Sequence, residues 1–111
     1  MANRNDKQAH IDYLTRRRDF LSVQMQKLSR ELDRCNLLIK YLDAIIDENS
    51  HLDAPKPMNK EQGELVYLGK HKSFLEKKLR VLQKDDRGCA RKLRDLNGQL
   101  EEEAAAMSTD E

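Results

Sequence analysis

The chain has 111 residues, of which 38% are hydrophobic, 37% are charged and only 5% are aromatic. This length suffices for one small domain, and the composition excludes a wide globular core, which needs more apolar and aromatic side chains. The net charge is +1, but the signs are segregated: residues 31–55 hold two basic and six acidic side chains, and residues 56–94 hold twelve basic and five acidic ones.

The first half of the chain predicts one long helix over residues 6–49, after an N-terminal extension over residues 1–5. Asn5 is its expected N-cap, with Gln8 reaching back to it as in a capping box. Apolar residues step by three and four, as at the a and d positions of a coiled-coil heptad, and Arg18 is the single break. These positions are Ile11, Leu14, Leu21, Met25, Leu28, Leu32, Cys35, Ile39, Leu42 and Ile46.

The second half predicts a turn and another long helix. Residues 50–58 contain both prolines, which disfavour helix at and before them. A helix is expected over residues 59–104, with Asn59 as N-cap, followed by an acidic disordered tail over residues 105–111. Its a and d positions are Leu65, Leu68, Lys72, Leu75, Leu79, Leu82, Asp86, Cys89, Leu93, Leu96 and Leu100, with Lys72 and Asp86 as polar breaks.

An internal repeat relates the two expected helices. Residues 13–35 match residues 67–89 at a constant offset, and the match includes Tyr, Phe and Cys as well as Leu. Two long apolar seams joined by a short turn predict an all-α fold, an antiparallel two-helix coiled-coil hairpin forming one domain. In architecture such a hairpin resembles the helical hairpins of prefoldin-like chaperones and of coiled-coil secretion chaperones and adaptors.

The register of the hairpin is expected to centre the turn between the two seams. The expected layers are Ile46 with Leu68, Ile39 with Leu75, Cys35 with Leu79, Leu32 with Leu82, Leu28 with Asp86, Met25 with Cys89, Leu21 with Leu93 and Leu14 with Leu100. In this register Lys72 reaches Asp43, and Asp86 reaches Lys27 or Arg30. Polar residues on a seam often fix its register at a cost in stability.

Extra apolar side chains flank the seam near the expected turn. Together they make a surface too wide for a two-helix seam alone. The simplest role of this surface is to bind a second copy of the chain, giving a dimer with a four-helix bundle near the loop. The other role is to bind a different protein partner. The candidate interface residues are Leu37, Leu38, Tyr41, Ile45, Val66, Tyr67, Phe74 and Val81.

Basic side chains offer an alternative site, for the phosphates of a nucleic acid, mainly in residues 70–94. The competing interpretation is a solvated helix face with ion pairs at helical spacing. A net charge near zero and the lack of a recognised nucleic-acid-binding motif favour the solvated face. The candidate phosphate-binding residues are Arg16, Arg17, Lys70, Lys77, Lys78, Arg80, Lys84 and Arg91.

No pattern in the sequence indicates catalysis, a metal or a cofactor. Cys35 and Cys89 occupy d positions, so we expect free thiols buried in the seam. His10, His51 and His71 are scattered, without a Cys or His partner at helical spacing, as a metal site would need. We therefore expect no catalytic, metal-binding or cofactor-binding residues.

The sequence as a whole favours a non-enzymatic module for protein–protein interaction. We expect a self-associating coiled coil that acts as an adaptor, chaperone or inhibitor of a protein partner. The alternative is a nucleic-acid-binding coiled coil that uses residues 70–94. Because the N-terminus lacks an apolar signal-peptide core and no run of about 18 apolar residues exists, we expect a cytoplasmic protein without a membrane partner.

Overall fold

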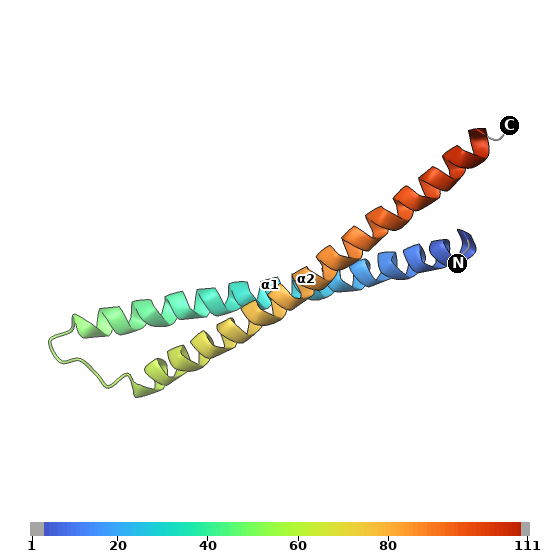
Figure 1. Ribbon diagram of the computed structural model, residues 1–111. Helices are drawn as coiled ribbons and strands as arrows, with labels where there is room; N and C mark the ends of the chain where they lie inside the picture. The colour runs from blue at the N-terminus through green and yellow to red at the C-terminus, as the bar shows by residue number, and fades with distance from the viewer. Residues whose placement is uncertain (1–3, 110–111) are drawn as a thin grey trace. The chain divides into compact units, whose positions relative to one another are not determined.

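The computed structural model describes residues 4–109, which form two helices, α1 (Arg4–Ser50) and α2 (Asn59–Thr109) (Figure 1). The helices have 47 and 51 residues, and no strand occurs in the described range. The all-α prediction and the division into two long helices are confirmed. The chain forms two compact units: unit 1 combines residues 1–25 and 81–111, and unit 2 is residues 26–80.

The helix ends differ in part from the sequence predictions. Asn5 lies inside α1 and is not its N-cap, and the Gln8 side chain donates to Asp12, 3.1 Å away, instead of reaching back. The rest of the predicted extension, residues 1–3, lies outside the described residues. At the other end α2 continues to Thr109, five residues beyond its predicted end, because residues 104–106 are three consecutive alanines, the residue with the highest helix propensity, and Met107 also favours helix. Residues 110–111 of the predicted tail lie outside the described residues.

Unit 1 is held together by the predicted seam. Its core consists of buried Leu14, Leu21 and Cys89. Half-buried seam residues from both helix halves pack against this core, namely Met25, Leu82, Leu93 and Leu96. The a and d assignment therefore identifies the buried side of both helix halves in this unit.

Ion pairs show that the expected register is wrong in unit 1. Asp86 accepts two hydrogen bonds from Arg18, at 2.9 and 3.3 Å, instead of pairing with Lys27 or Arg30. In the expected register Asp86 lay opposite Leu28, roughly three helical turns along α1 from Arg18. The observed register brings together the polar seam residues of two facing helices, whereas the expected one set Asp86 against leucine.

Unit 2 is a hairpin in which the end of α1 turns back into the start of α2 (Figure 1). Its buried apolar residues are Leu28, Cys35, Leu42 and Leu75, all at predicted d positions. The prediction that Lys72 pairs with Asp43 is wrong, because the described residues contain no such ion pair.

The turn of unit 2 is fixed by a side chain that the sequence analysis did not single out. Asn49 is buried at the end of α1, with 9% of its surface exposed. Its amide donates to the carbonyl of Lys56 at 2.8 Å and accepts from the Lys56 N–H at 3.0 Å. Beyond the turn, the Met58 carbonyl accepts from the Gln62 N–H at 2.9 Å, so Met58 takes the N-cap position predicted for Asn59.

Candidate functional site

One side of unit 2 carries a groove with apolar walls that both helices build. Leu38, Tyr41 and Leu42 of α1 and Glu64, Tyr67 and Leu68 of α2 line this groove, which has a volume of about 240 Å³. Leu42 is buried and Leu68 half-buried, so they form its floor. The walls are exposed: the exposed fraction is 63% for Tyr41 and 65% for Tyr67. The structure thus brings together three of the predicted interface residues, Leu38, Tyr41 and Tyr67.

A row of stacked side chains continues from this groove along α2. The Tyr67 and His71 rings lie 5.9 Å apart between centroids and are nearly parallel, at 5°. His71 stacks in turn with Phe74, at 6.4 Å and 19°, and the Lys78 ammonium lies 5.9 Å from the Phe74 centroid. Steps of four, three and four place these residues on one side of a helix. We call Tyr67, His71, Phe74 and Lys78 the aromatic row.

Sequence reasoning missed the part that His71 plays in this row. It considered His71 as a possible metal ligand, and not as a neighbour of aromatic rings on one side of a helix. The spacing from Tyr67 to His71 and from His71 to Phe74 was the available signal. The exposed fraction of Phe74 is 58%, so the row contains a second exposed ring beside that of Tyr67.

A second groove of unit 2 is polar. This groove, of about 350 Å³, is lined by Ser29, Leu32, Asp33, Asn36, Lys72 and Glu76. Only one of these side chains is apolar, and it is a half-buried seam residue. These two grooves of the same hairpin therefore differ in character, and of the two the groove of Leu38, Tyr41 and Tyr67 is the apolar one. We call the surface around it the apolar face.

The other predicted interface residues lie apart from the groove. Leu37 lines a hollow on α1 with polar neighbours, and Val66 lines a hollow on α2. Ile45 is half-buried. Val81 is exposed but belongs to unit 1. The role of these residues in an interface stays a prediction.

Most of the predicted phosphate-binding residues have no ion pair with another described residue. Of the eight, only Arg17 forms one within residues 4–109, with its nitrogen 2.6 Å from an Asp85 oxygen. That hydrogen bond raises the pKa of Arg17 and lowers the pKa of Asp85. Four of the remaining cations recur every seven residues along α2, a spacing that keeps neighbours on one side of a helix. They are Lys70, Lys77, Lys84 and Arg91.

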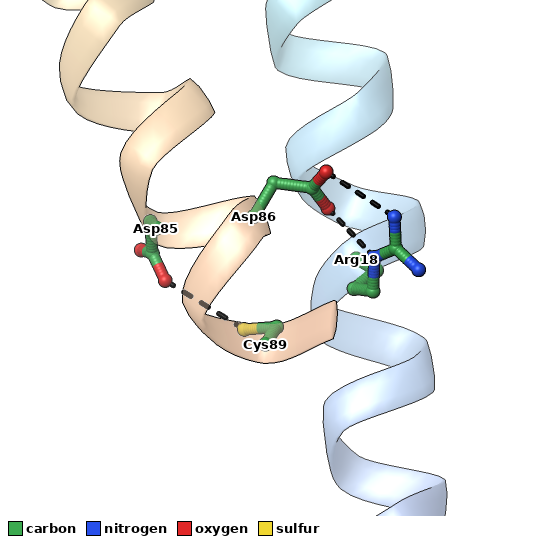
Figure 2. Close-up of polar contacts among 4 residues, drawn as sticks. All are labelled: Arg18, Asp85, Asp86 and Cys89. Atoms are coloured by element: carbon green, nitrogen blue, oxygen red, sulfur yellow. Dashed lines mark hydrogen bonds and ion pairs between the residues drawn. The ribbon is translucent and has the colours of Figure 1, made fainter. Parts of the chain in front are cut away.

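A polar cluster borders the core of unit 1 (Figure 2). Arg18 reaches from α1 to both carboxylate oxygens of Asp86, and this hydrogen bonding raises the pKa of Arg18. The Cys89 thiol donates to Asp85, with the sulfur 3.7 Å from the oxygen. Burial, and then the charge of Asp85, raise the pKa of Cys89. Cys89 is thus a free, buried thiol, as predicted, and its environment disfavours the reactive thiolate.

Comparison of the chain with known protein families, with curated proteins and with solved structures gave no match. Within the described residues, no three His, Cys, Asp or Glu side chains are grouped as a metal site would require. Neither helix, over the range that the structure describes, has a stretch long and apolar enough to cross a membrane. The apolar face of unit 2 is therefore the site with the most definite geometry.

Proposed function

We propose that the chain is a non-enzymatic coiled-coil module that binds a protein partner through the apolar face of unit 2. It self-associates through the same face, forming a four-helix bundle near the turn, and acts as an adaptor, chaperone or inhibitor. The observation that supports this proposal is the groove in which exposed Leu38, Tyr41 and Tyr67 meet, on a hairpin that carries a polar groove at Asn36 and Glu76.

The exposed area of the aromatic rings determines how much binding free energy a partner can gain by covering them. Tyr41, Tyr67 and Phe74 are each about three-fifths exposed. Covering them would remove roughly 300–450 Å² of surface from water, worth about 9 kcal/mol at about 25 cal/mol per Å². Association itself costs about 4–15 kcal/mol, so the rings alone support weak binding at most. A stable partner must also cover Leu38 and the floor of the groove.

Site-specific photo-crosslinking in an extract of the native cell tests this proposal. A photoreactive residue is placed at Tyr41 or Tyr67 on the apolar face, and at Asn36 or Glu76 in the polar groove as matched controls. We expect crosslinks to protein from the two apolar positions and little from the controls. Equal labelling from both grooves, or none from the apolar positions, would refute a binding role for this face.

A second candidate function, nucleic-acid binding, is favoured by the unpaired cations of α2. Binding through about six phosphates should weaken about 10³-fold between 50 and 200 mM salt. Replacing Lys70 and Lys77 by Glu should abolish it, whereas replacing Lys27 and Lys40 by Glu removes the same charge elsewhere. No binding at low salt, or equal loss in both variants, would exclude this candidate.

A further inference from the structure

We infer that the aromatic row of α2 packs against the same row of a second copy of the chain, antiparallel, with His71 on the two-fold axis. The inference rests on the proposed function, since it names the partner that covers the apolar face. It follows from the order of side chains along the row, which is complementary to itself.

With Glu64 included at its N-terminal end, the aromatic row is complementary to a reversed copy of itself. Glu64 lines the groove beside Tyr67, and it lies seven residues before His71, as Lys78 lies seven residues after it. Tyr67 and Phe74 stand four residues before and three residues after His71. An antiparallel copy therefore sets Glu64 of one chain against Lys78 of the other and Tyr67 against Phe74.

Every contact in this arrangement occurs twice, because a two-fold interface uses the same surface on both subunits. Two Tyr–Phe contacts form, in which exposed rings meet exposed rings. Two Glu–Lys contacts form, one at each end of the interface. The His71 rings, already stacked between Tyr67 and Phe74 in each chain, meet at the axis.

The charges select this orientation over the alternatives. A parallel copy would set Glu64 against Glu64 and Lys78 against Lys78, which is repulsive. Within one chain the two residues are fourteen positions apart, roughly 21 Å along the helix, so they cannot pair with each other. Neither one forms an ion pair within the described residues. A second copy supplies the missing opposite charge for both.

The apolar residues of α1 support the same partner. Leu38 and Tyr41 face Tyr67 across the groove, so the α1 helices flank the central pair of α2 helices on either side. The contact between two such faces is a four-helix arrangement confined to unit 2. The polar groove of Asn36 and Glu76 is not part of this contact and stays in solvent.

Charge reversal tests the orientation directly, by sedimentation of the full chain. Wild type should be a dimer. Glu64→Lys and Lys78→Glu should each weaken it at least about tenfold, because each places two like-charged pairs at the contact. An equimolar mixture of the two variants should dimerise again, and so should the double variant Glu64→Lys/Lys78→Glu. Glu76→Lys makes the same charge change in the polar groove and should leave the dimer unchanged.

The outcomes separate this inference from the proposed function. A monomeric wild type overturns the second copy and the self-association stated in the proposed function, while crosslinking of a different protein at Tyr67 would still support binding of a protein partner through the apolar face. A dimer that both reversals leave intact, or that the mixture fails to restore, overturns the antiparallel row. Far-UV circular dichroism of each variant verifies folding, and the double variant decides the question if a single reversal fails to fold.

Discussion

The ion pair between Arg18 and Asp86 should couple the two helix halves of unit 1. The contact is two-pronged, at 2.9 and 3.3 Å, and the side chains are 43% and 22% exposed. Exposed pairs contribute about 0.2–1 kcal/mol, and two-pronged geometry with partial burial places this one near the upper limit, about 1 kcal/mol. Reversing one charge replaces attraction by repulsion of similar size, so Arg18→Asp or Asp86→Arg should each cost about 2 kcal/mol.

Thermal unfolding of the wild type, the two single variants and the double variant measures this coupling. For a chain of this length, 1 kcal/mol shifts the melting temperature by about 4 °C, so each single reversal should lower it by about 8 °C. The double variant, with the charges exchanged, should recover most of the loss. Asp95 is exposed and lies on the same helix, and within the described part of the chain it has no ion pair. Asp95→Arg is therefore the control, with a change below about 0.5 kcal/mol.

Two results would contradict the reasoning. A coupling energy within about 0.3 kcal/mol of zero would mean that the pair does not contribute to stability. A reversal of Asp86 that is rescued by reversing Arg30, and not by reversing Arg18, would restore the register expected from the heptads alone.

Three further changes probe other parts of the structure. Asn49→Ala removes both hydrogen bonds to the backbone of Lys56 and should destabilise the chain by about 1–3 kcal/mol in a denaturant titration. Gly98→Ala should stabilise it by about 0.5–1 kcal/mol in the same titration, because an added Cβ meets nothing within 4 Å. Burial raises the pKa of Cys89 above its ordinary 9.0, so the thiol of the unfolded chain ionises first as pH rises. The free energy of unfolding should therefore fall above about pH 9, and Cys89→Ala should remove this dependence on pH.

The helices and their buried sides could be predicted because a long heptad pattern determines both. Leu14, Leu21, Leu28 and Leu75 were all assigned to the seam, and all are buried. The register could not be predicted in the same way. A shift of seven residues keeps every a and d position in phase, so apolar residues do not distinguish one register from the next. The polar seam residues decide the register, and the expected register gave Arg18 no partner.

Local polar contacts were the least predictable part of the fold. Asn49 occupies the d position that follows Leu42 by seven residues, and a polar residue there was a signal that the seam ends in a side-chain contact to the turn. Its partners are backbone atoms of Lys56, and no pattern of side chains identifies those. The N-cap assigned to Asn5 failed for a related reason, since a good capping residue also fits inside a helix that begins earlier.

The sequence located the apolar residues near the turn, and the structure shows which of them lie together. The apolar surplus near the turn includes Leu38, Tyr41 and Tyr67, which line one groove, and Leu37 and Val66, which line other hollows of unit 2. Leu38, Tyr41 and Tyr67 fall at heptad positions on one flank of the seam. Sorting the surplus by heptad position would have separated these two sets.

The internal repeat offers a matched control for the apolar face. Tyr13 and Phe20 correspond to Tyr67 and Phe74 in the repeat, and all four rings are 57–65% exposed. The residues around the first pair differ: the repeat matches Arg17 with His71, and Arg17 is bonded to Asp85.

The charges at the ends of the row differ as well. The repeat matches His10 with Glu64 and Gln24 with Lys78, so the first copy lacks the opposite charges that make the row of α2 complementary to itself. The two copies of the repeat therefore have equally exposed rings but different charges. Comparing them shows whether exposed rings alone, or rings together with the charge pairs, cause the proposed self-association.

Replacing Tyr67 and Phe74 by Ser should weaken the dimer at least about 100-fold, because four rings leave the contact. Replacing Tyr13 and Phe20 by Ser removes the same side chains from the first copy and should change the dissociation constant less than about threefold. Both are measured by sedimentation at several concentrations. Equal weakening in the two variants would show that exposed rings associate without regard to their neighbours, and the self-complementary row of α2 would then have no special role.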